Sequence, residues 1–203
     1  MKLIFATNNP HKVEELKAFV GNVFEILSLK EAGIYIDIPE PYDTLEENAS
    51  IKSKTIYDLT GLNCFSEDTG LEVEALDGAP GVKSARYAGE VKSFQKNIDK
   101  LLLNIDPFIN RKARFRAVIS LIVDGMETLF EGISEGRIIK EQRGVMGFGY
   151  DPIFVPDGES RTFAEMTIAE KSKFNHRTKA AAKLVAFLQN LKQTPQIEHN
   201  KQP

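Results

Sequence analysis

The stretch that most constrains the fold runs from Cys64 to Tyr87, because two strand-like segments there flank an acidic pair. Leu62–Ser66 mixes apolar and polar residues, as a strand that enters a core does. Leu71–Ala75 alternates apolar and acidic residues, as a half-buried strand does. The four residues between them, Glu67–Gly70, predict the end of one strand and a turn into the next, with Gly70 freeing the backbone.

Two adjacent carboxylates, Glu67 and Asp68, stand at this predicted strand end. One interpretation is a solvated acidic turn, because a surface tolerates such a pair at little cost. The other is a site for a divalent metal and water, because Mg²⁺ is usually held by one or two carboxylates plus substrate phosphates. This stretch alone leaves both interpretations open.

The length and charge of the chain limit the classes of protein to consider. A chain of 203 residues with 42% hydrophobic residues suits one domain, here expected as two lobes. A net charge of −3 gives no overall basic field to recruit nucleic acid or a membrane surface. The single cysteine, Cys64, and the absence of an apolar run of about 20 residues lead us to expect a cytoplasmic protein.

The N-terminus predicts a strand, Lys2–Ala6, that runs directly into a helix. Asn9 is a good N-cap, and Pro10 suits the first helical position. The connecting residues from Thr7 to Lys12 combine free N–H groups, the positive end of a helix dipole and an ammonium, which together favour a bound phosphate. Simple helix capping beside a surface lysine is the alternative.

A second helix is predicted from Thr44 to about Leu59, and Gly61 ends it. Glu47 has capping-box spacing, which explains it structurally. Lys52 lies within the apolar stripe of this helix. It either extends its ammonium out to solvent or reaches an anion in a cleft, with Asn48 one turn behind it.

The second half of the chain predicts a hairpin of two strands, Ala113–Val123 and Leu129–Ile139, joined by Asp124-Gly125. Within the second strand, Gly132 and Gly136 are expected to mark bulges or bends. Further predicted elements are a strand over residues 25–29, a helix over residues 94–102 and a short helix capped by Thr167 and Glu170.

A glycine-rich segment over residues 144–154 surrounds Phe148. Glycines on both sides let the backbone approach a ligand and present the ring, and an aromatic ring can stack on a nucleobase. Alternatively, the aromatic residues simply complete the core.

Asn175 is expected to cap a long C-terminal helix whose first turn holds His176 and Arg177. Two cations at a helix N-terminus oppose the dipole, so a ligand that accepts hydrogen bonds explains them. The residues expected to face inward on this helix are Ala180, Ala181, Leu184, Leu188 and Leu191.

Together these stretches resemble the inosine/xanthosine triphosphate pyrophosphatase family over nearly the whole chain, from Thr7 to Arg177. The motifs that carry the resemblance are Thr7–Lys12, Glu47-Asn48-Ala49 with Lys52, Glu67–Leu71, Pro80–Tyr87, Gly147–Pro152, Ala164-Glu165-Met166 with Lys171, and Asn175-His176-Arg177. Thr69 and Asn175 stand where serine is usual. Threonine keeps the hydroxyl and asparagine is an equally good N-cap, so neither change threatens the chemistry.

The resemblance implies an α/β fold with an elongated mixed central sheet, flanking helices and two lobes around a cleft, and a homodimer. It implies hydrolysis of ITP, dITP and XTP to the nucleoside monophosphate and pyrophosphate. Asp68 would be the base that activates water and a ligand of Mg²⁺, for which Mn²⁺ can substitute, and Glu40 a second metal ligand. Glu47 and Glu67 are further candidates near the metal. The implied substrate-binding residues are Thr7, Asn8, Asn9, Pro10, His11, Lys12, Lys52, Thr69, Phe148, Gly149, Tyr150, Asp151, Lys171, His176 and Arg177.

Two rival functions stay open at this point. A Maf-type nucleotide pyrophosphatase would prefer pyrimidine triphosphates, and a nucleotide- or RNA-binding module would show no turnover. The negative net charge and the acidic pair argue against binding long RNA. We expect the domain to span residues 1–192 and residues 193–203 to form a polar, disordered tail.

Overall fold

Three long strands, β3 (Cys64–Val73), β5 (Lys112–Val123) and β6 (Met126–Ile138), run through the whole length of the protein. The computed structural model describes residues 1–91 and 93–193. The strands form one mixed sheet in the order β2-β1-β3-β5-β6-β7, with β4 paired to β3. Among these described residues, β1 pairs in parallel with β2 and β3, and the other strand pairs are antiparallel. The shorter strands are β1 (Lys2–Phe5), β2 (Glu25–Ser28), β4 (Pro80–Gly81) and β7 (Phe154–Pro156).

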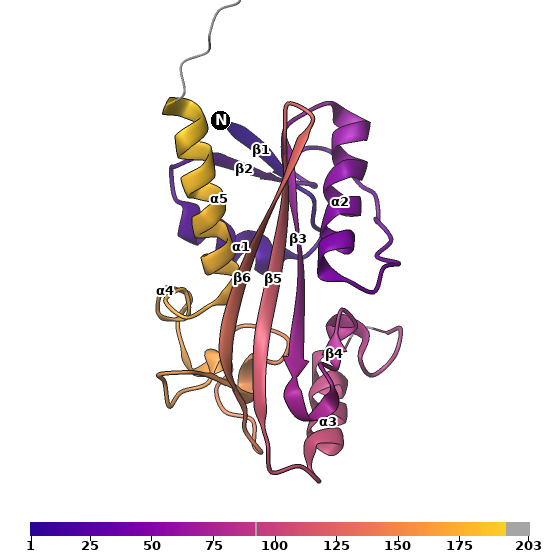
Figure 1. The fold of residues 1–203 in the computed structure, drawn as a ribbon, viewed down its shortest axis with the longest axis vertical. Coiled ribbons are helices and arrows are strands. Elements are labelled where there is room, and N and C mark those ends of the chain that lie inside the picture. Colours follow the sequence, from indigo (N-terminus) through magenta and orange to yellow (C-terminus); the bar gives the residue numbers. More distant parts are fainter. Residues whose placement is uncertain (92, 194–203) are drawn as a thin grey trace, which may run out of the picture.

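Helices cover this sheet in two lobes, as the resemblance implied (Figure 1). One lobe holds β1, β2, α2 and α5, the other holds α3 and β4, and α1 and α4 lie near the middle. The helices are α1 (Pro10–Val20), α2 (Leu45–Thr60), α3 (Phe94–Ile105), α4 (Ile168–Lys171) and α5 (His176–Gln193). Short 3₁₀ helices span Glu74–Leu76, Ser84–Arg86, Asp151–Ile153 and Phe163–Glu165.

Local capping explains where the helices begin and end, and it confirms the predicted boundaries. The Asn9 side chain accepts a hydrogen bond from the His11 amide at 3.0 Å, which opens α1 at Pro10. The Thr44 hydroxyl does the same for the Glu47 amide at the start of α2. Gly61 ends α2 at φ 65°, a conformation that glycine adopts without strain.

The predicted turn at Glu67–Gly70 is wrong, because β3 continues through it without interruption. Glu67 lies opposite Ile119 and Asp68 opposite Val118 in the ladder with β5. Both faces of β3 are covered at this point, so polar and apolar residues do not alternate there as they do in a half-exposed strand. Gly70 instead allows the backbone of β4 to lie close to β3, because a Cβ at this position would lie 2.7 Å from the Gly81 carbonyl oxygen.

The hairpin of β5 and β6 forms as predicted, with Asp124 and Gly125 at positive φ in its two-residue turn. The expected bulges at Gly132 and Gly136 are wrong, because both glycines stay in regular ladder register. A Cβ at Gly132 would lie 2.1 Å from the carbonyl oxygen of His176. The glycine therefore lets the first turn of α5 pack directly on the sheet.

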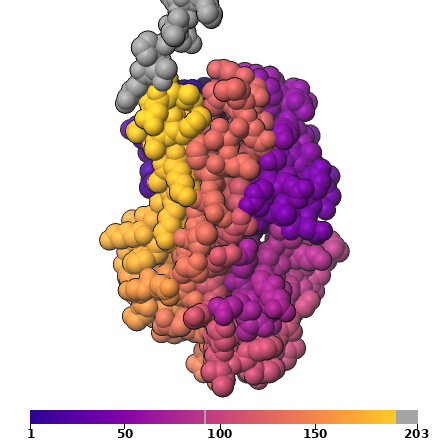
Figure 2. Space-filling model, viewed as in Figure 1, coloured from indigo at the N-terminus to yellow at the C-terminus, as the bar shows by residue number. Residues whose placement is uncertain are grey.

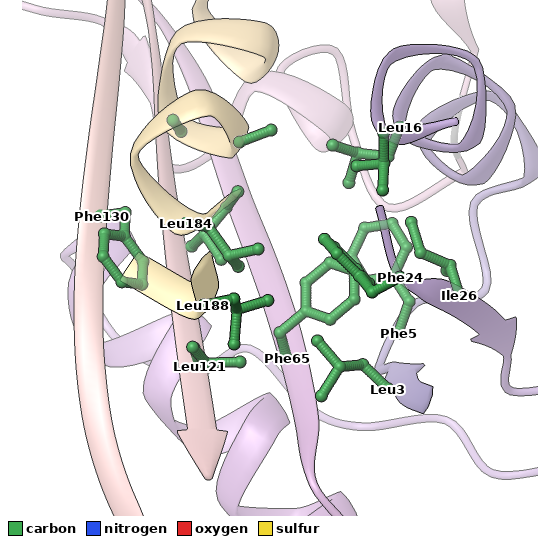
Figure 3. Packing of buried hydrophobic residues seen from close by; sticks show 14 of the residues in the cluster. Leu3, Phe5, Leu16, Phe24, Ile26, Phe65, Leu121, Phe130, Leu184 and Leu188 are labelled. Atoms are coloured by element: carbon green, nitrogen blue, oxygen red, sulfur yellow. The ribbon is translucent and has the colours of Figure 1, made fainter. Parts of the chain in front are cut away.

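The larger core lies between α1, α5 and the sheet, and it fixes the first strand. Phe5 stacks on Phe65 with ring centroids 4.4 Å apart, so β1 and the loop after it are held against β3. Leu191 on α5 is 41% exposed, contrary to the prediction that it faces inward. Figure 3 shows the packing of this core, including Leu3, Phe5, Leu16, Phe24, Ile26, Phe65, Leu121, Phe130, Leu184 and Leu188.

A second core lies in the other lobe and positions the glycine-rich segment. Phe115 on β5 contacts the rings of Phe154 and Phe163, at centroid distances of 4.8 and 6.1 Å. Ile153 and Tyr150 are buried in the same cluster. The segment around Phe148 is therefore tied to the far end of the sheet.

Two sequence predictions concern the limits of the chain. Within residues 1–91 and 93–193 we find no helix with the length and apolar character that crossing a membrane requires. Residues 194–203 of the predicted tail lie outside the described residues, and the domain limits at 1–192 stay a prediction.

Candidate active site

A cavity of about 500 Å³ lies where the two lobes meet, beside the middle of β3. In Figure 2 the purple surface of one lobe and the magenta surface of the other meet at a narrow opening. The residues that line the cavity include all those implied to bind substrate, together with Asp68 and Glu40. They come from the β1–α1 loop, α2, β3, the 148–151 segment, α4 and the start of α5, and from the segment before α2 that carries Glu40. Glu67 is buried on β3 and is not part of the lining. Glu47 is not part of it either: it is exposed and contacts Thr44 at the N-terminus of α2.

The β1–α1 loop forms one wall, and its polar groups are already engaged in shaping it. The Thr7 hydroxyl accepts from the Asn9 amide at 3.2 Å, and the Asn8 side chain donates to the Ile36 carbonyl at 2.9 Å. Lys12 reaches Glu67, at 3.3 Å from both its carbonyl and its carboxylate. Burial lowers the pKa of Lys12, although Glu67 opposes this shift.

Lys52 crosses the cavity and joins two carboxylates. Its ammonium lies 2.5 Å from Glu40 and 3.0 Å from Asp68, and it donates to the Glu67 carbonyl at 2.9 Å. Burial opposes protonation of Lys52, but Asp68 and Glu40 outweigh it and raise the pKa of the ammonium. Lys52 therefore faces an anionic cleft and does not extend to solvent.

The two adjacent carboxylates of β3 have opposite electrostatic environments. Burial raises the pKa of Asp68, with Glu40 adding to the shift and Lys52 opposing it. Burial would also raise the pKa of Glu67, but Arg177 and Lys12 outweigh it and hold this pKa well below its usual range. Asp68 therefore takes up a proton more readily than an ordinary aspartate, whereas Glu67 is held in its anionic form.

Glu67 anchors the first turn of α5. Arg177 donates to its two carboxylate oxygens from Nε at 2.7 Å and from Nη2 at 2.9 Å, a bidentate pair. The Thr69 hydroxyl also donates to Glu67, which occupies the hydroxyl that was expected to bind substrate. The unfavourable charge of Arg177 near a helix N-terminus is therefore offset by a carboxylate of the protein itself.

Glu15 on α1 extends this network, and our sequence reasoning missed it. It accepts from Lys171 at 2.7 Å, from Asn175 at 3.0 Å and from Arg177. Burial opposes the shift, but Arg177 and Lys171 lower the pKa of Glu15 to about 2. The one available signal was helical spacing, because Lys12 and Glu15 stand three residues apart on one face of α1.

Phe148 lies partly buried at the far end of the cavity, surrounded by rings and cations. The His11 ring stacks on it, with centroids 5.0 Å apart and planes 13° from parallel. The Lys171 ammonium stands 5.2 Å from its centroid and the Arg177 guanidinium 5.6 Å. An aromatic face flanked by cations suits a planar, electron-rich ligand.

Asp151 is held beside this ring by the glycine-rich segment. One carboxylate oxygen, Oδ2, accepts from the Phe148 amide at 2.9 Å and from Lys171 at 2.7 Å. A Cβ at Gly147 would lie 2.0 Å from that oxygen, which explains the glycine. Burial raises the pKa of Asp151, and Lys171 opposes the shift. Oδ1 has no hydrogen-bond partner among the described residues, so it can accept from a ligand.

His176 and Tyr150 complete this end of the cavity in different ways. Tyr150 is buried and donates its hydroxyl to the Ser84 carbonyl at 2.9 Å, so it supports the wall. His176 stacks on Phe115 at 4.8 Å, and burial lowers its pKa well below the usual value. Both ring nitrogens of this neutral imidazole are buried without a hydrogen-bond partner, unlike any other buried side-chain nitrogen or oxygen in the described residues.

The carboxylates near Lys52 are the available metal ligands. Within residues 1–91 and 93–193, no three His, Cys, Asp or Glu side chains cluster closely enough to hold an ion by themselves. Asp68 and Glu40 face each other across the Lys52 ammonium. Two carboxylates fit Mg²⁺, which takes its other ligands from water and substrate phosphates.

Comparison with known proteins places this arrangement in a family. The sequence matches the model described as "Ham1 family" over residues 3–187. A dITP/XTP pyrophosphatase from Christiangramia forsetii is 50% identical over 188 residues, 93% of this chain and 99% of the relative. One from Porphyromonas gingivalis is 51% identical over 188 residues, 92% of this chain and 97% of the relative.

Solved structures agree with the sequence relatives. The Staphylococcus aureus Ham1 protein superposes with a TM-score of 0.85 at 36% identity, covering 94% of this chain and all of its own. A Mycobacterium abscessus structure titled nucleoside-triphosphatase / dITP/XTP pyrophosphatase gives a TM-score of 0.73 at 39% identity, covering 91% and 98%. The chain belongs to the Ham1 family.

Proposed function

We propose that this protein hydrolyses the non-canonical purine triphosphates ITP, dITP and XTP to the nucleoside monophosphate and pyrophosphate. Its relatives in the Ham1 family carry the name dITP/XTP pyrophosphatase. The observation that supports this most directly is His176, which lines the same cavity as Asp68 and Lys52 and whose two ring nitrogens have no partner among the described residues. A buried polar group without a partner is costly unless a ligand supplies one.

The polarity of the base pocket favours keto purines. Hypoxanthine and xanthine present a protonated N1 beside a carbonyl at position 6, whereas adenine presents an acceptor beside an amino group. Asp151 as a carboxylate can only accept a hydrogen bond, and Arg177 can only donate. The Arg177 guanidinium has five N–H groups. Nε and Nη2 each use one of them to bind Glu67, and Nη1 uses one to bind Glu15, so N–H donors remain for a ligand.

At the other end of the cavity, the residues suit an attack by water on the α-phosphorus. Asp68 accepts a proton from the water as the new P–O bond forms, and the bond to the β-phosphate bridging oxygen breaks to release pyrophosphate. Lys12 and Lys52 hold the phosphate oxygens and stabilise the charge on the leaving group. The raised pKa of Asp68 suits a group that must take up a proton.

A divalent cation is part of this proposal because the cleft supplies little free positive charge. Lys12 and Lys52 already contact carboxylates at 3.3 Å or less. Asp68 and Glu40 would hold Mg²⁺, or Mn²⁺ in its place, together with phosphate oxygens. The ion would neutralise the triphosphate and polarise its α-phosphate.

A turnover screen tests the proposed function. Purified protein with Mg²⁺ is given ITP, dITP, XTP, GTP, ATP, dTTP and UTP, and pyrophosphate and nucleoside monophosphate are measured together. We expect the three non-canonical purines to give the highest kcat/KM. Preference for dTTP or UTP would favour a Maf-type activity, and absence of all turnover would favour a binding module.

We further propose a homodimer and a cytoplasmic location. The family resemblance supports the dimer, and the single buried Cys64 suits a reducing compartment. Light scattering after size exclusion would test the first, and cell fractionation the second.

A further inference from the structure

Alternating charges along the cavity form two runs of ion pairs, which meet where Glu67 and Asp68 stand next to each other on β3. We call the two runs together the cleft chain. Asp151 contacts Lys171, which contacts Glu15, and Glu15 contacts Arg177. The first run continues from Arg177 to Glu67 and from Glu67 to Lys12. The second run starts at Asp68, the neighbour of Glu67, and leads to Lys52, Glu40 and Arg86. The cleft chain thus starts in the base pocket at Asp151 and ends at Arg86.

Arg86 differs from the other cations in how weakly it is paired. Its Nη1 lies 3.8 Å from Oε2 of Glu40, whereas every other cation of the cleft chain has a carboxylate oxygen within 3.3 Å. Glu40 itself is engaged by Lys52 at 2.5 Å. The Arg86 side chain is 38% exposed, against 8% for Lys52. Arg86 can therefore take an incoming anion without leaving a buried carboxylate unpaired.

The backbone that carries Arg86 is held firmly from the second lobe. Asn97 on α3 donates to the carbonyl oxygens of Ala85 at 3.1 Å and Ser84 at 3.3 Å. Arg86 thus enters the cavity from the 3₁₀ helix Ser84–Arg86, opposite the lysines that come from α1 and α2. A fixed backbone with a free guanidinium suits bidentate binding of phosphate.

We propose that Arg86 binds the β- and γ-phosphates of the substrate, the part that leaves as pyrophosphate. This rests on the proposed function, in which Asp68 acts at the α-phosphorus and the base lies near Asp151. Along the cleft chain, Arg86 stands beyond Lys52 and Glu40, at the end away from the base. The nearest carboxylate oxygen to the Arg86 guanidinium is Oε2 of Glu40 at 3.8 Å, so its positive charge is less neutralised than that of Lys52 or Lys12.

Arg86→Gln tests the proposal, because glutamine keeps part of the stem and removes the charge. We expect kcat/KM for ITP to fall about 10- to 100-fold, as for one lost hydrogen-bonded contact to a charged group. The inhibition constant of pyrophosphate should rise by a similar factor, while that of IMP stays within about twofold. Lys83→Gln is the matched control, since Lys83 is an exposed neighbour that does not line the cavity.

Isothermal titration with inorganic pyrophosphate and Mg²⁺ separates this proposal from the proposed function. Binding lost in Arg86→Gln and kept in Lys83→Gln supports the role of Arg86, even if the wild type cleaves no ITP. If the wild type cleaves ITP and the two variants bind pyrophosphate equally well, the proposal is overturned. A loss of IMP affinity as large as the loss of pyrophosphate affinity also overturns it, because Arg86 would then contact the nucleoside monophosphate half. Matching melting temperatures of both variants establish that the fold is kept.

Discussion

Replacing Asp68 by asparagine removes the proposed base while keeping a side chain of nearly the same size. The adjacent change Glu67→Gln has the same chemical nature, so the two variants form a matched pair. They lie on one strand, and both carboxylates are buried, at 7% and 1% exposure. What separates them is their partners, because Glu67 binds Arg177, Lys12 and Thr69.

The structure predicts opposite costs for the pair. Burial raises the pKa of Asp68, so the folded protein tolerates a neutral group there, and Lys52 keeps Glu40 as a partner. Asp68→Asn should lose about 10²- to 10⁴-fold in kcat, the usual contribution of a general base, and little stability. Glu67→Gln leaves Arg177 and Lys12 without this carboxylate, which should cost about 3–5 kcal/mol of unfolding free energy.

Thermal unfolding and single-turnover hydrolysis of ITP measure the two effects separately. For a chain of this length, about 3–5 kcal/mol corresponds to a fall of roughly 6–20 °C in Tm for Glu67→Gln. Asp68→Asn should stay within about 4 °C of the wild type. Near wild-type turnover by folded Asp68→Asn would assign the base elsewhere. A Tm of Glu67→Gln equal to that of the wild type would refute the electrostatic argument.

Four further predictions follow from the same site. Excess chelator should abolish turnover and added Mg²⁺ restore it; full activity in chelator would remove the metal from the proposal. In acid, kcat/KM should fall as Asp68 becomes protonated, at a pH above the ordinary pKa of an aspartate. In alkali, kcat/KM should fall as Lys12 loses its proton, at a pH below the ordinary pKa of a lysine. A flat pH profile would contradict both shifts. Because Glu15 has a lowered pKa, its contribution to stability is present above about pH 4.5 and is lost as the pH falls toward about 2. Measuring Tm across this pH range tests this, and an unchanged acid transition in Glu15→Gln would exclude the contribution of Glu15. Asp151→Asn should reduce the ITP-over-ATP ratio of kcat/KM from roughly 10⁴, and an unchanged large ratio would move base selection to another residue.

Sequence patterns predicted the parts of the fold that short-range physics controls. The caps at Asn9 and Thr44 and the turn at Asp124-Gly125 depend on neighbours within four residues, and they form as expected. The turn at Glu67–Gly70 was wrong because alternation reveals a strand only when one face meets water. In β3, packing from both sides removes that signal.

The candidate site was also predictable from the sequence only in part. Its motif residues were visible in sequence, but the partnerships among them were not. Glu15 lies 162 residues from Arg177, and Arg86 meets Glu40 only because the lobes face each other. Gly132 looked like a bulge because its real neighbour, the carbonyl of His176, comes from a distant helix. Such contacts depend on tertiary packing, which no local pattern records.

The internal ion pairs of the cleft chain also have a consequence for ligand exchange under the proposed function. Because the cations of the site are paired with its own carboxylates, substrate binding would exchange one set of ion pairs for another. Dissolved salt screens the internal ion pairs and the ion pairs with the ligand alike, so its effect on the binding free energy largely cancels. The geometric fit of the ligand then decides its affinity. Under the proposed function, a triphosphate would replace several pairs of the cleft chain at once. The shorter products would replace fewer pairs, so re-formation of the internal pairs would favour their release.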